Sequence, residues 1–178
     1  PTTFALDPDT DFVSGETCKL TVYAANVADQ DYIDPPDTMD ADFTTSFTAW
    51  VDVCTLTYTP IYQIQGSGLS AAIVGTVTTQ GVVVGDFEGS ASQSGFYMQD
   101  LTGDGNTATS DGIFVYTGSN NFVSAGQVVR VTGYARERYN QTTLNGSNSN
   151  TAVVPAANIS QCGTGSIDPV DVSMPFAT

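Results

Sequence analysis

The chain has 178 residues, enough for one ordinary domain or two small ones. It is 40% hydrophobic but only 13% charged, and 19 acidic residues against 4 basic ones give a formal net charge of -15. This charge argues against strong binding to a phosphate polymer, and the absence of histidine removes the commonest general base and transition-metal ligand. No apolar run approaches the roughly 18–20 residues of a membrane helix, so we expect no membrane span.

The first 53 residues predict part of a β-sandwich. Apolar residues alternate with polar ones in two segments, "CKLTVYAANV" (residues 18–27) and "DFTTSFTA" (residues 42–49), which is the period of half-buried strands. Together with "TTFALDP" (residues 2–8) they would form about three strands with one apolar face. Three strands cannot bury such a face alone, so another sheet must cover it.

Residues 54–165 predict a small closed Greek-key barrel, and residues 166–178 a C-terminal linker or donor strand. Glycines interrupt the longer strands where a strand in a small barrel must bend. We expect no helix beyond a turn near "NNFVSAG". The five expected strands are residues 75–87, 95–100, 112–118, 127–139 and 150–156.

The three cysteines, Cys18, Cys54 and Cys162, suggest one disulfide and one free thiol. Cys54 and Cys162 stand at the two ends of the expected barrel, so we predict that they pair and join those ends. Cys18 would then be either a small buried apolar residue or a partner for a cysteine of another chain. A disulfide and an acidic, lysine-poor surface favour an extracellular location.

Several motifs occur in one order along the barrel segment: "IYQIQGSG", "VGTVTTQGVVVGDFEG", "SGFYMQDLTGDGNTATSDGIFVYTG" and "GQVVRVTGYARERYNQTTL". This order resembles the OB-fold-like domain that precedes the catalytic domain in large secreted nucleases of the endonuclease/exonuclease/phosphatase class. Upstream, "LDPDTDFVSGETCKLTV" and "DPPDTMDADFTTSF" resemble the end of a bacterial Ig-like domain. The resemblance implies an all-β chain, a partial Ig-like β-sandwich followed by a five-stranded OB-like barrel. The catalytic domain of that family has no counterpart here, so we expect no enzymatic activity.

The acidic stretch "DLTGDGNTATSDG" (residues 100–112) has two interpretations. Its oxygen-bearing side chains among glycines are ligands that Ca²⁺ accepts, although their spacing departs from the helix-loop-helix calcium motif. Alternatively, they form Asx turns between two strands. The four candidate ligands are Asp100, Asp104, Asn106 and Asp111. A second cluster, Asp29, Asp31, Asp34, Asp37, Asp40 and Asp42, predicts either another cation site or a solvated loop.

The second and third strands of an OB barrel commonly bind nucleic acid or sugar. Strand alternation here predicts one aromatic platform with two arginines nearby, although such aromatics also serve as ordinary cross-strand pairs. Nucleic-acid binding would be weak at most on so acidic a molecule. The platform residues are Tyr97, Phe114, Tyr116, Arg136 and Arg138. Three N-x-[ST] sequons add candidate glycosylation sites at Asn140, Asn145 and Asn158.

The tail "PVDVSMPF" places Val170, Val172, Met174 and Phe176 on one face of an extended strand. Such a strand could complete the open sandwich of a neighbouring chain or domain, and repeated head-to-tail contacts would give a fibre. The leading hypothesis is therefore a secreted, non-catalytic structural module. The alternatives are an accessory nucleic-acid-binding or spacer module of a secreted nuclease, and a carbohydrate-binding adhesin module.

Overall fold

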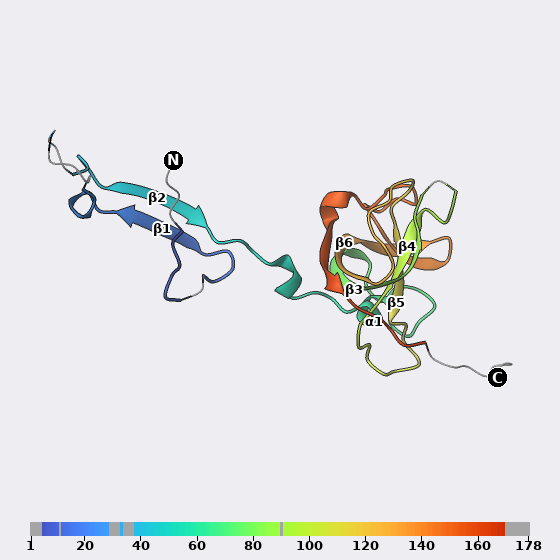
Figure 1. Ribbon diagram of the computed structural model, residues 1–178. Coiled ribbons are helices and arrows are strands. Elements are labelled where there is room, and N and C mark those ends of the chain that lie inside the picture. Colours follow the sequence, from blue (N-terminus) through green and yellow to red (C-terminus); the bar gives the residue numbers. More distant parts are fainter. Residues whose placement is uncertain (1–4, 11, 29–32, 34–37, 90, 170–178) are drawn as a thin grey trace. The chain divides into compact units, whose positions relative to one another are not determined.

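The computed structural model describes residues 5–10, 12–28, 33, 38–89 and 91–169 (Figure 1). The chain divides into two compact units, Pro1–Asp52 and Val53–Thr178, one residue from the boundary expected from the sequence. We call them the N-terminal unit and the barrel unit. Over these described residues the fold is all-β apart from one five-residue helix and three short 3-10 turns. No helix in the described part of the chain has the length and hydropathy needed to cross a membrane.

The described residues of the N-terminal unit form a two-stranded antiparallel sheet. Strand β1 (Thr17–Val22) pairs with β2 (Phe43–Thr48), so that Cys18 lies opposite Phe47 and Val22 opposite Phe43. Residues 5–8, which belong to a third strand expected from the sequence, form no strand. The short turn η1 (Ala24–Asn26) follows β1, and the carboxylate of Asp42 accepts a hydrogen bond from the Ala24 N–H at 2.8 Å.

The barrel unit confirms the expected five-stranded OB-like barrel. Its strands close in the order β3-β4-β5-β7-β6, because β6 also pairs with β3. The pairing of β5 with β7 is parallel and the other pairings are antiparallel. An additional strand, β8, pairs with the first half of β6. The bounds are β3 (Gly75–Phe87), β4 (Gly95–Gln99), β5 (Gly112–Tyr116), β6 (Gln127–Arg138), β7 (Gln141–Asn145) and β8 (Ile159–Thr164).

Strand alternation produces the barrel core. On β4, Phe96 and Met98 point inward, and on β5, Ile113 and Val115 do the same, as their positions in the sequence predicted. All four are fully or almost fully buried and belong to one cluster. The other members of this cluster are Ile61, Ile64, Val83, Val123, Val129, Val131, Ala135, Leu144 and Val154.

Two sequence-based assignments in the barrel were wrong. The fifth barrel strand is β7, not residues 150–156, which form no strand. Tyr139 and Asn140 both adopt positive φ, at 54° and 65°, and this two-residue turn sends the chain straight back along β6. The helix α1 (Ile61–Gln65) was also not expected, and it packs Ile61 and Ile64 into the core. The remaining 3-10 turns are η2 (Val53–Thr55) and η3 (Ala156–Asn158).

Candidate functional site

The outer side of β4 and β5 carries a patch that we call the aromatic face, defined by Tyr97, Phe114 and Tyr116. Tyr97 lies opposite Phe114 in the strand register, and their ring centroids are 4.8 Å apart. Phe87, at the end of β3, contacts Tyr97 edge-on at 6.1 Å. The structure therefore brings together the aromatic residues that strand alternation placed on one side.

The two tyrosines of the aromatic face are half-exposed, whereas Phe114 is only 3% exposed. Gly95 explains this difference, because a Cβ at that position would lie 2.5 Å from Cζ of Phe114. The glycine lets the phenylalanine ring lie flat on the neighbouring strand. Phe114 therefore supports Tyr97 from beside it, and the predicted stacking platform is reduced to Tyr97 and Tyr116.

The two predicted arginines occupy different environments. The guanidinium carbon of Arg138 lies 3.9 Å from the centroid of Tyr116, and its Nε donates to the carbonyl of Asn150 at 2.8 Å. Arg136 lies on the same strand, but its Nη1 is buried without a hydrogen-bond partner among the described residues. Arg138 is thus a direct neighbour of the aromatic face, and it occupies the ring face that a ligand would need at Tyr116.

A polar side chain completes the aromatic face. The amide nitrogen of Gln141 donates to the hydroxyl of Tyr97 at 3.0 Å, and Gln141 is exposed at the start of β7. Tyrosine rings combined with an amide and a guanidinium offer both stacking surfaces and hydrogen-bond donors. Such a combination can bind sugars or unpaired bases.

The acidic loop, residues 100–111, connects β4 to β5. Asp100 is 6% exposed, and its Oδ2 accepts hydrogen bonds from the backbone N–H groups of Ile61 at 2.8 Å and Tyr62 at 3.3 Å. This carboxylate therefore caps helix α1 from a distant part of the chain. Burial raises the pKa of Asp100 to about 6, with smaller contributions from the carboxylates of Asp111 and Asp104, while the two backbone N–H groups oppose the shift.

The remaining acidic-loop residues have separate local roles. Asp104 accepts from the Asn106 N–H at 2.9 Å and from the Thr109 hydroxyl at 3.0 Å, and Asn106 accepts from the Ala108 N–H at 3.1 Å. These are the Asx turns of the alternative interpretation. The Oδ1 of Asp111 is buried without a hydrogen-bond partner among the described residues.

No group of three or more His, Cys, Asp or Glu side chains in the described ranges is arranged to hold a metal ion. Calcium binding by the acidic loop stays a prediction. Of the second acidic cluster, Asp40 and Asp42 are described, and the other four residues lie outside the described residues.

The three predicted glycosylation sites differ in accessibility. Asn140 is exposed in the turn between β6 and β7. Asn158 is half-buried, and its amide donates to the carbonyl of Thr132 at 3.1 Å. Asn145 is fully buried, and its amide donates to the Ala152 carbonyl. In the folded barrel the Asn145 side chain has no solvent access, and glycosylation at the three sites stays a prediction.

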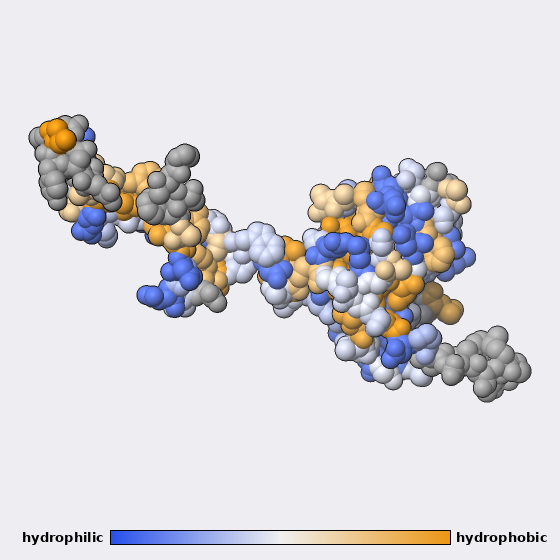
Figure 2. Space-filling model, in the orientation of Figure 1, coloured by the Kyte–Doolittle hydropathy of each residue, from blue (hydrophilic) through white to orange (hydrophobic). Residues whose placement is uncertain are grey.

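The sheet of the N-terminal unit has one apolar face, which consists of Cys18, Leu20 and Val22 on β1 and Phe43 and Phe47 on β2. Figure 2 shows hydrophobic residues at the surface of this unit. Phe43 is 54% exposed and Phe47 42% exposed, which is unusual for two aromatic residues on the inner face of a sheet.

A hollow of about 340 Å³ lies on the apolar face, between the sheet and the segment that precedes it. It is lined by Leu6, Phe12, Cys18, Leu20 and Phe47, among others. Phe12 contacts Phe47 edge-on at 5.5 Å, so the preceding segment covers part of the face. Cys18 is a free, half-buried cysteine on this face. The proposed strand donors Val170, Val172, Met174 and Phe176 lie outside the described residues.

The disulfide joins Cys54 to Cys162, with their Cα atoms 5.4 Å apart, as the sequence predicted.

Comparisons of the chain with protein-family models, curated proteins and solved structures found no match in any of the three. The resemblance to the OB-like module of secreted nucleases therefore stays a prediction.

Proposed function

We propose that this chain is a non-catalytic, extracellular structural module that assembles head-to-tail with further copies by strand complementation. The observation that carries the proposal is the apolar face of the N-terminal unit. Phe43 and Phe47 remain about half-exposed there, and the described residues supply two strands and no second sheet. A two-stranded sheet with an apolar face is marginally stable in water by itself. A further strand on this unit would pair an open sheet edge, and its apolar side chains would cover part of that face.

The proposed donor is the C-terminal tail of another copy. Its apolar residues Val170, Val172 and Met174 recur at every second position, which matches the side-chain period of a strand. Pro175 lacks a backbone N–H. The paired part of the tail would therefore end before Pro175, or the nitrogen of Pro175 would lie on the unpaired edge of the added strand. Because donor and acceptor lie on different parts of the chain, each contact leaves both ends free to continue, and the product is an open fibre.

Light scattering over a range of protein concentrations tests this function. The full chain should form polymers, and deletion of residues 168–178 should leave a monomer. A synthetic peptide of residues 166–178 should then bind the deleted chain with one-to-one stoichiometry. The matched control is the same peptide with Val172→Asp and Met174→Asp, which keeps the length but removes the apolar alternation. A full chain that stays monomeric at high concentration, together with a peptide that does not bind, would end the proposal.

The aromatic face favours a second function, carbohydrate binding by the barrel unit. Tyr97 and Tyr116 are half-exposed on one outer surface, with Gln141 and Arg138 as adjacent hydrogen-bond donors. A neutral sugar suits this surface better than a phosphate polymer does, because the whole chain carries a net charge of -15. Glycan-array binding that is lost in Tyr97→Ala and retained in the distant variant Tyr58→Ala would support this function. Binding of single-stranded DNA alone would favour the accessory nucleic-acid function instead.

A further inference from the structure

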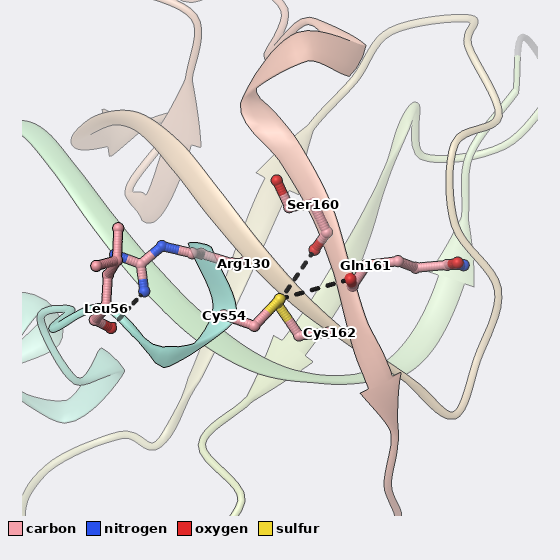
Figure 3. Close-up of a disulfide and its surroundings, with 6 residues drawn as sticks. All are labelled: Cys54, Leu56, Arg130, Ser160, Gln161 and Cys162. Carbon is pink, nitrogen blue, oxygen red and sulfur yellow. Dashed lines mark hydrogen bonds between the residues drawn. A yellow bond between two sulfur atoms is a disulfide. The ribbon is translucent and has the colours of Figure 1, made fainter. Parts of the chain in front are cut away.

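The disulfide joins the two ends of the barrel. Figure 3 shows Cys54, in turn η2, bonded to Cys162 on strand β8. The two residues are 108 positions apart in the chain, but their Cα atoms are 5.4 Å apart. All five strands of the closed barrel lie in the chain segment between them. The covalent path from one end of the barrel unit to the other therefore bypasses the barrel.

We propose that the Cys54–Cys162 disulfide is a mechanical shortcut, which carries tension between the N-terminal unit and the C-terminal tail past the barrel. This inference rests on the proposed fibre, where each chain would be pulled at its N-terminal unit and at its tail. A force applied at these two places reaches Cys54 on one side and Cys162 on the other, and then crosses the bridge. The enclosed residues bear no load as long as the bridge is intact.

Little chain lies outside the bridge on the barrel side. Val53 directly precedes Cys54, so tension from the N-terminal unit reaches the bridge almost at once. On the other side, Gly163, Thr164 and Gly165 separate Cys162 from the tail. The backbone contacts of these three residues are with residues 126–128, including a 2.9 Å hydrogen bond from Gly165 N–H to the Gly126 carbonyl. Peeling these contacts releases only a few residues before the bridge takes the load.

Without the bridge, the barrel would open from its weakest edge. Strand β8 pairs only with β6 among the described strands, in an antiparallel register that begins at the pair of Thr164 with Gln127. Pulling on the tail would separate these pairs one after another, and sequential breakage of hydrogen bonds needs little force. The bridge at Cys162 stops this peeling at the third residue.

The entry segment is also fixed to the barrel. The guanidinium of Arg130 donates to the carbonyls of Leu56 at 2.8 Å and Thr57 at 2.7 Å, and the Thr59 N–H donates to the Thr78 carbonyl. Figure 3 shows Arg130 and Leu56 beside the disulfide. The Arg130 side chain is 9% exposed, and both hydrogen bonds are partly buried. They hold Cys54 beside β8 whether or not tension is applied.

Single-molecule force-clamp measurements on the full chain, held by handles fused to its two ends, test the shortcut. The oxidised chain should show no unfolding step from the enclosed residues. After addition of dithiothreitol, one step of about 370 Å should appear, the length of the 108-residue separation when extended, less the span of the bridge. Its rate should rise with force, because tension on a disulfide promotes attack by a thiolate, which forms a mixed disulfide and releases the other sulfur as a thiolate.

The double variant Cys54→Ser/Cys162→Ser should show barrel unfolding without reductant, and reduction of the native chain under force gives the same information if this variant does not fold. Barrel unfolding steps in the oxidised chain would overturn the shortcut, and so would a reduction rate that is independent of force. The measurement uses single molecules. If light scattering shows no assembly, the force-clamp result on the disulfide still holds. If the force-clamp result contradicts the shortcut, the light-scattering result on assembly still holds.

Discussion

The two units of this chain use the same strand pattern with different outcomes. In the barrel unit, alternation on β4 places Phe96 and Met98 in a closed core, where neither is exposed. In the N-terminal unit, the same alternation places Leu20 and Phe47 on a face that the described residues cover only in part. The pattern of a strand therefore determines which of its faces is apolar, whereas the number of paired strands determines whether that face is buried.

The two units also differ in net charge. Residues 1–52 contain 11 acidic residues and 1 basic residue, a net charge of -10, and residues 53–178 contain 8 acidic and 3 basic residues, a net charge of -5. Like charges that are crowded on a small unit oppose its compaction. The N-terminal unit thus combines few buried residues with a high density of negative charge, which is consistent with the proposal that a second copy stabilises it.

Removal of the disulfide should give the largest difference between the two units, because it should lower the free energy of unfolding of the barrel unit only. For a closed loop of 108 residues, the chain-entropy model gives a loss of about 4–5 kcal/mol in the free energy of unfolding. Urea denaturation of Cys54→Ala/Cys162→Ala measures it, with tyrosine near-UV circular dichroism as the barrel probe. Trp50, the only tryptophan, reports the N-terminal unit by fluorescence and should not change. A loss below about 1 kcal/mol in the barrel would contradict the prediction.

Truncation of one phenylalanine in each unit should lower the free energy of unfolding by different amounts in the two units. Phe96→Ala should cost about 3–5 kcal/mol, because it leaves a cavity in the closed core. Phe47→Ala should cost under about 1 kcal/mol in the monomer, since the side chain is 42% exposed. Urea denaturation of the two variants under the same conditions checks both values. Similar losses in the two variants would show that the apolar face of the N-terminal unit is already covered in solution.

The sequence predicted the strands that have a strong pattern of their own. Strand β3 was expected at residues 75–87 and found at Gly75–Phe87, and β6 was expected at residues 127–139 and found at Gln127–Arg138. Strand β7 was missed because "QTTLN" contains one large apolar residue, and because Tyr139 and Asn140 do not form a familiar turn sequence. Helix α1 has five residues and depends on a carboxylate 39 positions away, so no local pattern could indicate it.

The sequence predicted which residues form the candidate site, but not what each of them does in the fold. Alternation placed Tyr97, Phe114 and Tyr116 on one side, and the structure brings them together. The burial of Phe114 depends on the absence of a side chain at Gly95 on the adjacent strand. The role of Asp100 as a helix cap likewise depends on a contact that only the tertiary fold creates.

Replacement of Asp100 should change the pH dependence of the barrel unit. The pKa of this carboxyl is 3.8 in an ordinary environment and about 6 in the fold, so the folded state binds its proton more tightly. The resulting stabilisation is fully present below about pH 4 and is lost as the pH rises through about 6. Asp100→Asn keeps an oxygen acceptor for the Ile61 N–H but does not titrate.

We expect Asp100→Asn to gain stability relative to the native chain between pH 4 and pH 7, measured by urea denaturation at closely spaced pH values. Asp86→Asn is the matched control, because Asp86 is an exposed carboxylate at the end of β3. A constant difference between Asp100→Asn and the native chain across this range would show that Asp100 has an ordinary pKa in the fold.

The smallest expected effect is at the aromatic face, where Arg138 lies over the ring of Tyr116 at 3.9 Å. A cation–π contact between partly exposed groups contributes about 0.5–1 kcal/mol. A double-mutant cycle with Arg138→Gln and Tyr116→Leu isolates it, because the Nε bond from Arg138 to the Asn150 carbonyl is lost equally in both backgrounds. The same Arg138→Gln variant should have the opposite effect on glycan binding, where it should raise the affinity. Removal of Arg138 uncovers the Tyr116 ring, so Arg138→Gln should bind sugar more tightly than the native chain. Weaker binding would contradict this prediction and would show that the guanidinium itself contacts the ligand.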